Sequence, residues 1–537
     1  MKGQVKTYIA LIFVVVAIFT GFYIGSVKTE RKYSMRYNPD APASLLFRYK
    51  LDTIGQLILN QYVDEIDNDS IMDRVFSSML SSLDPHSTYI SRKELNDEIA
   101  TLRGNFEGVG IVVRMINDTV RAAQVISGGP SDKAGVQAGD CILSVDGIKL
   151  SGVKMSNDDV VAHLRGPRKS VADLKIKRAY ETEPRLLKVV RDVIQTPSLS
   201  FSSMIDKETG YIHLTRFSES TYPEFRKAVI NLKAQGMKRM VLDLRGNGGG
   251  LLSTAIAICD DLLPGKELIV YTQGAHQKRE EEHSKPGGLF SNGELIVMID
   301  EYSASASEIV AGAIQDNDRG LIVGRRSFGK GLVQQQVALP DGSAMLLTVA
   351  RYYTPSGRCI QRPYDKGTDK YYEEYIQQIL NGYTNDSLLS KVTDPTPYHT
   401  SKGRVVYGGG GIYPDHTISY QKDTNIIYFN QLISSGAIDE YVVNLVSYTG
   451  HKIKKSYRTP EEFIRLFKVT DNDLEAVYRK ASSKGVARNN KSIAAYKEQI
   501  RSRIKAEIGE MLYSNATFYE VLLWTDTDIK EAMSLFK

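Results

Sequence analysis

The chain has 537 residues, which is room for about three or four domains of average size. Apolar residues make up 42% and charged residues 24%, so a disordered or fibrous chain is excluded. The formal net charge of +5 is small for this length and argues against a nucleic-acid binder. Cys141, Cys259 and Cys359 lack CxxC spacing, so neither a zinc site nor a disulfide scaffold is expected.

The chain begins with an apolar stretch that predicts a membrane anchor. Residues 7–27 carry no charge and are rich in Ile, Val, Phe and Ala, and a helix of this length spans roughly 30 Å, the thickness of the hydrocarbon core. A cleaved signal peptide is the alternative, but Tyr23-Ile24-Gly25-Ser26 is a poor cleavage site. We therefore expect residues 1–27 to be an uncleaved anchor with a short N-terminal flank.

The flanking charges leave the orientation of this anchor open. The basic residues between 28 and 36 outnumber Lys2 and Lys6 in front of it. The positive-inside rule alone would place the body of the protein in the cytoplasm, and only the function inferred below argues for export.

The rest of the chain divides by pattern into four regions. Residues 28–102 combine a polar linker with apolar residues at helical spacing, which predicts a helical N-terminal domain. Residues 103–192 carry short strand patterns with Gly-rich turns. From 193 to 424, strand-like runs at 239–244, 294–300 and 320–323 alternate with helical patterns, with a polar, Tyr-rich insertion at 362–407. Residues 425–537 predict a helical C-terminal extension.

A serine-rich segment lies where the predicted strand 294–300 gives way to a helix expected from Glu308 to Asp316. Serines in such turns are usually helix caps, and Ser305-x-x-Glu308 has the form of a capping box. Small neighbouring residues would, however, leave a serine hydroxyl open to a substrate, and the helix N-terminus supplies N–H groups that can hold an oxyanion. Both interpretations stay open at this point.

A second segment, Gly324 to Gly331, has the GxxxxGK spacing of a P-loop. Nucleotide binding is disfavoured because Gly331 replaces the Ser or Thr that binds magnesium. The residues after it predict a hairpin strand, whereas a P-loop opens into a helix. Lys330 has apolar neighbours, and on an extended segment Lys330, Leu332 and Gln334 point to one face.

A third segment is a predicted buried strand, Val241–Leu244, that runs into the glycine turn 245–250. Such a turn is often only structural, but it can also bring backbone N–H groups against a ligand. The eight histidines are scattered and form no HExxH motif. A Ser–His–Asp triad stays open, because triad members need not be near in sequence, but a Ser/Lys pair is better motivated.

Several motifs in order make the chain resemble the carboxyl-terminal processing peptidases, also called tail-specific proteases, from about Leu51 to Asp415. The motifs are Leu83-Asp84-Pro85-His86-Ser87, the Leu-Arg-Gly-Asn-Gly-Gly-Gly turn, Ser303-Ala304-Ser305-Ala306-Ser307-Glu308, Gly329-Lys330-Gly331, Arg351-Tyr352-Tyr353-Thr354-Pro355-Ser356-Gly357-Arg358 and Gly411-Ile412-Tyr413-Pro414-Asp415.

The resemblance implies a serine peptidase with a Ser/Lys dyad and no cofactor. Ser305 would be the nucleophile, Lys330 the base, and Gln334 the residue that orients the lysine. The oxyanion donors would be the backbone N–H groups of Ala306 and Gly250. A lysine base must be neutral, so its pKa must fall from about 10.4 towards 7–8, which an apolar pocket can achieve.

Residues 103–192 resemble a PDZ domain. Val109-Gly110-Ile111 matches the loop that captures a terminal carboxylate, and Asp158–Arg165 matches the helix that closes the groove. A substrate tail would add a strand along this groove. Arg165 either caps the helix C-terminus or switches partners when a carboxylate arrives and so signals to the catalytic domain.

The sequence thus predicts a multidomain α/β chain: a membrane helix, a helical domain, a PDZ-like domain, an α/β protease core and a helical extension. We expect an endopeptidase that cleaves near substrate C-termini, on the periplasmic or extracytoplasmic side of a bacterial cytoplasmic membrane, where it spares cytoplasmic proteins. A homo-oligomer or an adaptor protein is a further possible partner, and nucleic acid is not expected. The alternative is a non-catalytic PDZ scaffold or carrier, which would be expected to have lost Ser305 or Lys330.

Overall fold

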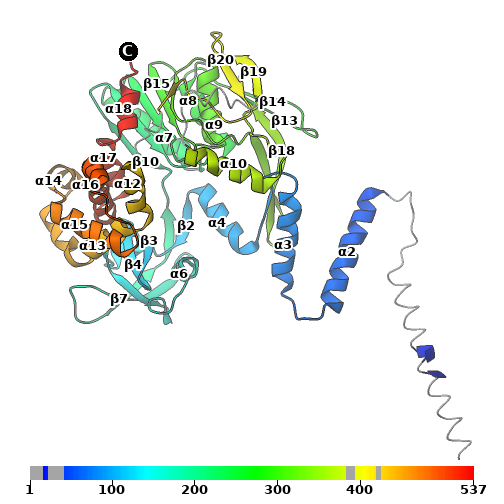
Figure 1. The fold of residues 1–537 in the computed structure, drawn as a ribbon, viewed down its shortest axis with the longest axis horizontal. Coiled ribbons are helices and arrows are strands. Elements are labelled where there is room, and N and C mark those ends of the chain that lie inside the picture. The colour runs from blue at the N-terminus through cyan, green and yellow to red at the C-terminus, as the bar shows by residue number, and fades with distance from the viewer. Residues whose placement is uncertain (1–15, 18, 22–41, 382–393, 419–424) are drawn as a thin grey trace, which may run out of the picture. The chain divides into compact units, whose positions relative to one another are not determined.

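The computed structural model describes residues 16–17, 19–21, 42–381, 394–418 and 425–537 (Figure 1). Most of the predicted anchor at 7–27 and the linker after it lie outside these residues. Within the described ranges, no helix combines the length and the apolar character needed to cross a membrane. The chain divides into two compact units, Met1–Ser78 and Met79–Lys537.

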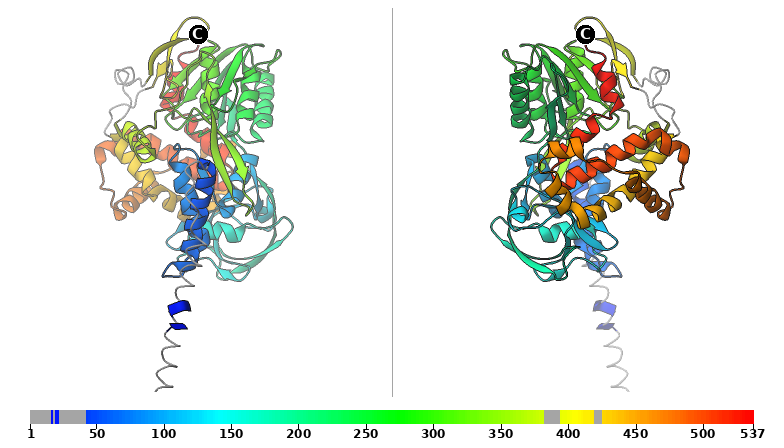
Figure 2. Two further views of the ribbon diagram at one scale, coloured as in Figure 1. Left: turned by 90° about the vertical axis from the view of Figure 1, so that its right-hand side faces the viewer. Right: turned by 90° about the vertical axis from the view of Figure 1, so that its left-hand side faces the viewer.

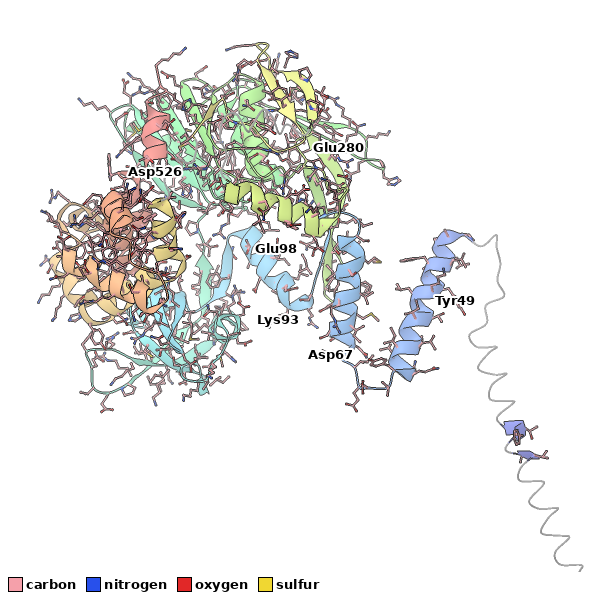
Figure 3. All side chains as sticks on the ribbon, in the orientation of Figure 1. Tyr49, Asp67, Lys93, Glu98, Glu280 and Asp526 are labelled. Atoms are coloured by element: carbon pink, nitrogen blue, oxygen red, sulfur yellow. The ribbon has the colours of Figure 1, made fainter. Side chains whose placement is uncertain are left out.

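The first unit contains helix α2 (Ala43–Gln61) and most of helix α3 (Asn68–Ser81), as the helical spacing predicts. Asp67 (labelled in Figure 3) lies just before α3, where its carboxylate caps the helix by accepting a hydrogen bond from the backbone N–H of Asp69 at 3.2 Å. The two helices line a shared apolar hollow with side chains that include Leu51, Ile54, Ile58, Ile71 and Val75.

The second unit begins with strand β1 (Thr88–Ile90) and helix α4 (Arg92–Arg103), followed by the β-rich domain. The main sheet of this domain has the order β3-β4-β5-β7-β8, so β3 is an edge strand. Its elements are β2 (Asn105–Gly108), β3 (Ile111–Ile116), β4 (Thr119–Val125), α5 (Pro130–Lys133), β5 (Cys141–Val145), β6 (Ile148–Lys149), α6 (Asn157–Leu164), β7 (Val171–Lys177), β8 (Arg185–Val190) and β9 (Asp192–Gln195). Strands β2 and β9 pair with each other where the chain enters and leaves the domain.

The α/β core is built on a six-stranded sheet of order β10-β11-β12-β15-β16-β21, parallel from β11 onward. Its strands are β10 (Leu199–Met204), β11 (Thr209–Leu214), β12 (Arg239–Asp243), β15 (Glu294–Ile299), β16 (Leu321–Gly324) and β21 (His416–Thr417). Helices α7 (Thr221–Ala234), α8 (Leu252–Leu262) and α9 (Ala306–Asp316) share one hydrophobic core with one face of this sheet (Figure 1). The strands predicted from the apolar runs at 239–244, 294–300 and 320–323 are therefore confirmed. Such strands read as continuous apolar runs because the central strands of a parallel sheet are buried on both faces.

One helix boundary differs from the prediction. The helix expected to begin at Glu308 begins at Ala306, which makes Ser305 its N-cap.

A second sheet contains β13 (Leu268–Gln273), β14 (Glu280–His283), β17 (Leu332–Ala338) and β18 (Ala344–Tyr353), with β1 paired to β18. The segment after Lys330 is thus a hairpin strand, as predicted, and this confirms that the GxxxxGK match is not a P-loop. The described part of the insertion forms α10 (Thr368–Asn381), β19 (Asp394–His399) and β20 (Val405–Gly408).

The C-terminal helices contribute residues to two different hydrophobic cores. Five of them share one core: α12 (Asn425–Ser434), α13 (Ala437–Ser456), α14 (Pro460–Leu466), α15 (Asp471–Ser483) and α16 (Asn490–Leu512). The last two, α17 (Asn515–Leu523) and α18 (Thr527–Met533), instead cover the second face of the parallel sheet. Leu523 and Ile529 pack there against Tyr211, Val241 and Met298.

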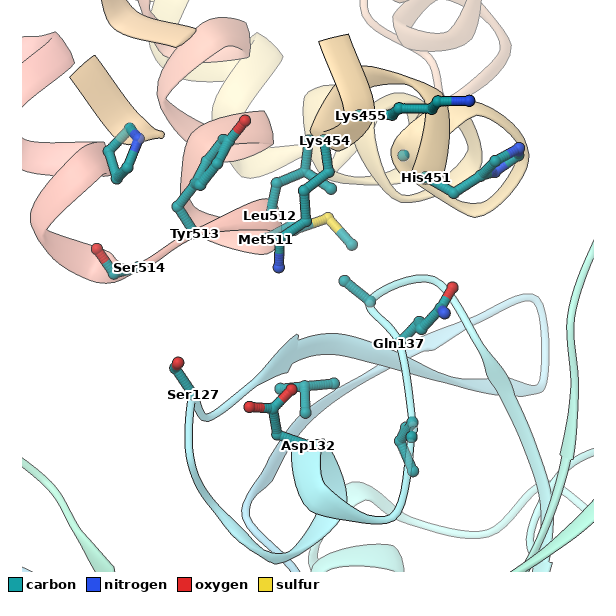
Figure 4. Close-up of a pocket in the computed structure, with 16 residues that line it drawn as sticks. Ser127, Asp132, Gln137, His451, Lys454, Lys455, Met511, Leu512, Tyr513 and Ser514 are labelled. Carbon is teal, nitrogen blue, oxygen red and sulfur yellow. The ribbon is translucent and has the colours of Figure 1, made fainter. Parts of the chain in front are cut away.

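The β-rich domain packs against helix α13 (Figure 2). Ser447 Oγ donates to the carbonyl oxygen of Gly139 at 3.0 Å, and a Cβ on Gly139 would lie 2.6 Å from Ser447 Cα. Arg114 forms an ion pair with Asp439. Between the domain and the helices lies a hollow of about 840 Å³, whose lining Figure 4 shows.

Candidate active site

Three loops converge at one edge of the parallel sheet. The glycine turn follows β12, the Ser305 loop follows β15, and the Lys330 loop follows β16. These strands are parallel neighbours, so their carboxyl ends share one edge, where open α/β sheets form their binding sites.

The Ser305 loop is pinned to the glycine turn. Asp300 Oδ1 accepts hydrogen bonds from the N–H groups of Gly246 at 2.9 Å and Ser303 at 3.1 Å. The N–H of Ala304 donates to the carbonyl oxygen of Asn247 at 3.0 Å. These bonds fix the position of the Ser305 loop relative to the glycine turn.

Ser305 occupies a strained and accessible position. Its φ of 54° lies in the left-handed region, which costs a residue other than glycine about 1–3 kcal/mol. Ser305 is partly exposed, whereas all the remaining residues from Ser303 to Asp316 are buried. The fold therefore leaves Ser305 accessible from outside the core.

Two backbone N–H groups, one in the Ser305 loop and one in the glycine turn that touches it, have no acceptor among the described residues. Ala306 supplies the first N–H of α9. In the glycine turn, the bridge to Phe217 uses the carbonyl of Gly249 and the N–H of Leu251, which leaves the N–H of Gly250 free. A Cβ on Gly249 would lie 2.8 Å from Ser305 Cβ, so the turn touches the serine directly. This arrangement can hold a developing oxyanion.

The Ser305 and Lys330 loops are joined by the buried carboxylate of Glu308. It accepts hydrogen bonds from the N–H groups of Ser305 at 2.9 Å, Gly329 at 2.7 Å and Lys330 at 2.9 Å, and from Ser327 Oγ at 2.5 Å. Burial raises the pKa of Glu308 to about 7, while these donors favour the ionised form. The sequence predicted this residue only as half of a capping box.

Tyr352 forms a second bridge between the same loops. Its buried hydroxyl donates to the carbonyl oxygen of Lys330 at 2.6 Å and lies 3.2 Å from that of Ser305. The sequence gave this tyrosine no role, because it lies in a strand of the other sheet.

Lys330 is half-buried beside the serine loop. Burial lowers the pKa of its amine, and the carboxylates of Glu308, Asp84 and Glu98 act in the opposite direction. A lowered pKa is what a general base requires. The described residues show no hydrogen bond between Ser305 Oγ and Lys330 Nζ.

Gln334 lies on β17 and connects to the Leu-Asp-Pro-His-Ser motif. Its side-chain amide donates to Thr348 Oγ1 at 3.3 Å, and that hydroxyl donates to Asp84 Oδ1 at 3.1 Å. Asp84 also accepts from Ser87 Oγ at 2.6 Å. The structure thus anchors Gln334 through Thr348.

The end of the chain contacts the same loops through ion pairs. Arg245, in the glycine turn, pairs with Asp526 (labelled in Figure 3) at 2.8 Å, and Arg325, ahead of Lys330, pairs with Asp528 at 2.9 Å. Partners that are 281 and 203 residues apart leave no local pattern, so the sequence did not indicate them.

The predicted tail-binding residues lie together in the β-rich domain. Val109-Gly110-Ile111 leads directly into the edge strand β3, and Gly110 has a φ of 75°. Arg165 lies just past the end of α6 and bridges to Gly108, beside this loop. Its side chain pairs with Asp97 of α4 and lies over the ring of Phe106, 5.4 Å from the centroid.

Comparison with known proteins finds three matching families. The profile of Peptidase family S41 matches residues 208–369, and that of the PDZ domain matches 121–178. A family of unknown function, DUF8443, matches 428–514.

Curated relatives carry related names. The carboxy-terminal-processing protease of Bartonella bacilliformis is 38% identical over 57% of this chain and 71% of its own. The carboxy-terminal processing protease CtpA of Bacillus subtilis is 32% identical over 58% and 66%. A solved structure titled photosystem II D1 C-terminal processing protease is 29% identical, covers 58% of this chain and 83% of its own, and has a TM-score of 0.34.

We expect the substitution Glu308→Gln to loosen both loops. A glutamine must point its NH₂ group at an N–H donor whichever way it is turned, and an unmade buried hydrogen bond costs about 1–3 kcal/mol. Hydrogen exchange in peptides covering 303–308 and 325–332 should accelerate about 10-fold or more. The matched control is Glu94→Gln, an exposed glutamate that faces Ser91 in a capping box of the same spacing. Unchanged exchange in Glu308→Gln would contradict the bridging role.

Proposed function

The chain belongs to the carboxyl-terminal processing protease family and is a serine-type peptidase, and from this premise we propose that Ser305 and Lys330 form its catalytic dyad. The observation that carries the proposal is the placement of the partly exposed Ser305 at the start of α9 and against the glycine turn, on a loop that Glu308 ties to Lys330. The lowered pKa of Lys330 supports the base role.

In this mechanism the neutral amine of Lys330 accepts the proton of Ser305 as Oγ attacks the carbonyl carbon of the substrate. The N–H groups of Ala306 and Gly250 hold the oxyanion of the tetrahedral intermediate. When the intermediate collapses, the C–N bond breaks and the Lys330 ammonium protonates the leaving amine. Water, deprotonated in turn by Lys330, then hydrolyses the acyl-enzyme.

If the two residues act as one unit, Ser305→Ala, Lys330→Ala and the double variant should each lose activity by about 10³-fold or more, to a similar level. The measurement is cleavage of an unfolded protein with an apolar C-terminus. Lys227→Ala, an exposed lysine on α7, is the matched control. Full activity in Lys330→Ala would refute the dyad and reopen a histidine base.

We further propose that the PDZ domain captures the substrate C-terminus and gates the dyad. An extended tail can pair with the edge strand β3, with its carboxylate at Val109–Ile111. Arg165 is the candidate relay, because it lies beside that loop and pairs with Asp97 outside the domain.

Under gating, wild type should cleave a substrate with a free C-terminus about 5–150-fold faster than the same substrate with an amidated one. Arg165→Ala should lose most of this difference while keeping its fold. Arg168→Ala is the control, since Arg168 pairs with Asp192 on the domain surface. Equal rates for both substrates in wild type would show that the domain tethers substrates and does not gate.

For location, we propose that residues 7–27 anchor the chain in a bacterial cytoplasmic membrane with the catalytic body outside the cytoplasm. The uncharged stretch and a degradative activity support this arrangement. Protease added to intact spheroplasts should then remove residues beyond the anchor, whereas full protection of the body would indicate the opposite orientation.

A further inference from the structure

We propose that the helical C-terminal extension forms the outer end of the tail-binding groove. There it binds the part of a substrate that lies roughly five to seven residues before the free C-terminus. The ligand is an extended, polar peptide segment that pairs with β3 through its main chain. The inference deepens the proposed capture of substrate tails by the PDZ domain and rests on it.

Two contacts fix the direction of the groove between β3 and α6. Arg165, just past the end of α6, bridges to Gly108, beside the loop Val109–Ile111 that leads into β3. Asn157, the first residue of α6, lines the same hollow as the last residues of β3. Helix α6 therefore runs antiparallel to β3. A tail whose carboxylate is held at the loop runs back along β3 toward Asn157.

At that far end lies a hollow of about 290 Å³, here called the outer hollow. It is lined by the end of β3 and the residue after it, the start of α6 and the C-terminal extension, through Val113–Asn117, Asn157, Gly436, Asp439, Glu440 and Lys484. Alternate side chains of a strand point to opposite faces, so a hollow over one face would be lined by every second residue. Consecutive residues line this one, which places it along the edge of β3.

The edge of β3 at the outer hollow is open to an added strand. Among the described residues, β3 pairs with β4 alone. Such an edge presents N–H and C=O groups that another extended segment can bind. At about 3.4 Å per residue, a tail that ends at Val109–Ile111 brings roughly its fifth to seventh residue, counted back from the end, to the outer hollow.

Specific contacts hold the start of α13 beside the end of β3 (Figure 1). Arg114 of β3 forms an ion pair with Asp439 of α13. Just after β3, Asn117 Nδ2 donates to Glu440 Oε1 at 3.2 Å. Ile116 packs against the hydrophobic core of the extension. The strand that a tail would join is thus the strand that fixes the extension at the outer hollow.

The charged groups of the outer hollow are paired, and this decides which kind of segment it suits. Asp439 pairs with Arg114, and Glu440 pairs with Lys480 at 2.8 Å and with Lys484 at 3.1 Å. The side chains of Arg114, Asp439 and Lys484 are 32%, 39% and 35% exposed. A lining with both signs selects no single charge, but an apolar segment would strip these groups of water without replacing it. A polar segment that binds through its main chain avoids this cost.

The test compares the binding of two fluorescent peptides to the full chain carrying Ser305→Ala, which prevents cleavage. Both peptides have a free C-terminus and the same last four residues, and the longer one has six additional polar residues before them. We expect the ten-residue peptide to bind about 10-fold more tightly, because its longer main chain forms further hydrogen bonds with β3.

The substitution Lys484→Trp fills the outer hollow from the side of the extension. It should weaken binding of the ten-residue peptide about 10-fold, to the level of the four-residue peptide, whose own affinity should not change. Lys480→Trp is the matched control, because both lysines pair with Glu440 and only Lys484 lines the hollow. Unchanged binding of the ten-residue peptide to the Lys484→Trp variant would overturn the inference.

Crosslinking tests the same placement without a substitution in the hollow. A photoreactive benzoylphenylalanine takes the sixth position from the end of the ten-residue peptide, and mass spectrometry locates the crosslinks on the Ser305→Ala chain. We expect crosslinks to residues 436–440 and to Lys484, which line the outer hollow. Crosslinks confined to residues 105–195 would overturn the inference, whether or not the Lys484→Trp variant folds.

Amidated peptides separate this inference from the proposed tail capture. If amidation weakens binding of both peptides but the two lengths bind equally well, tail capture stands and the role of the extension is refuted. If amidated and free peptides bind equally well at both lengths, tail capture is refuted and the inference fails with it.

Discussion

The Glu308 carboxylate accepts four hydrogen bonds from loops that leave two different strands, and the geometry of the site depends on it. Neither loop has regular secondary structure that could fix its own backbone. With Tyr352 holding the two carbonyl groups, the serine and the lysine are positioned through their main chains. Their side chains thus remain free to approach each other and a substrate.

The secondary structure around Ser305 and Lys330 was predictable from the sequence, because it depends only on residues that are close together in the chain. The strand–turn–helix around Ser305 and the strand after Lys330 follow from hydrophobic runs and small residues. The bridging role of Tyr352 was not predictable, and neither were the ion pairs of Asp526 and Asp528 with the active-site loops. Both depend on which distant segments of the chain meet. The helix start at Ala306 was missed by two residues, because the serines before it also suit a loop.

The domains around this core are coupled by packing as well as by chain connection. The PDZ domain contacts α13 through Gly139 and Ser447, where the glycine allows backbone contact that any side chain would prevent. Arg165 reaches α4 from the same domain. A change at the loop Val109–Ile111 can therefore reach both neighbours through packed side chains as well as through the chain connection.

The covering of the parallel sheet by α17 and α18 has a consequence for folding. Tyr211, Val241 and Met298 are covered by Leu523 and Ile529, which come much later in the chain. One apolar face of the sheet therefore stays uncovered until these two helices have been synthesised and have docked, and such exposed faces attract chaperones or aggregate. Completion of the peptidase sheet thus depends on a segment that lies outside the residues 208–369 matched by the peptidase profile.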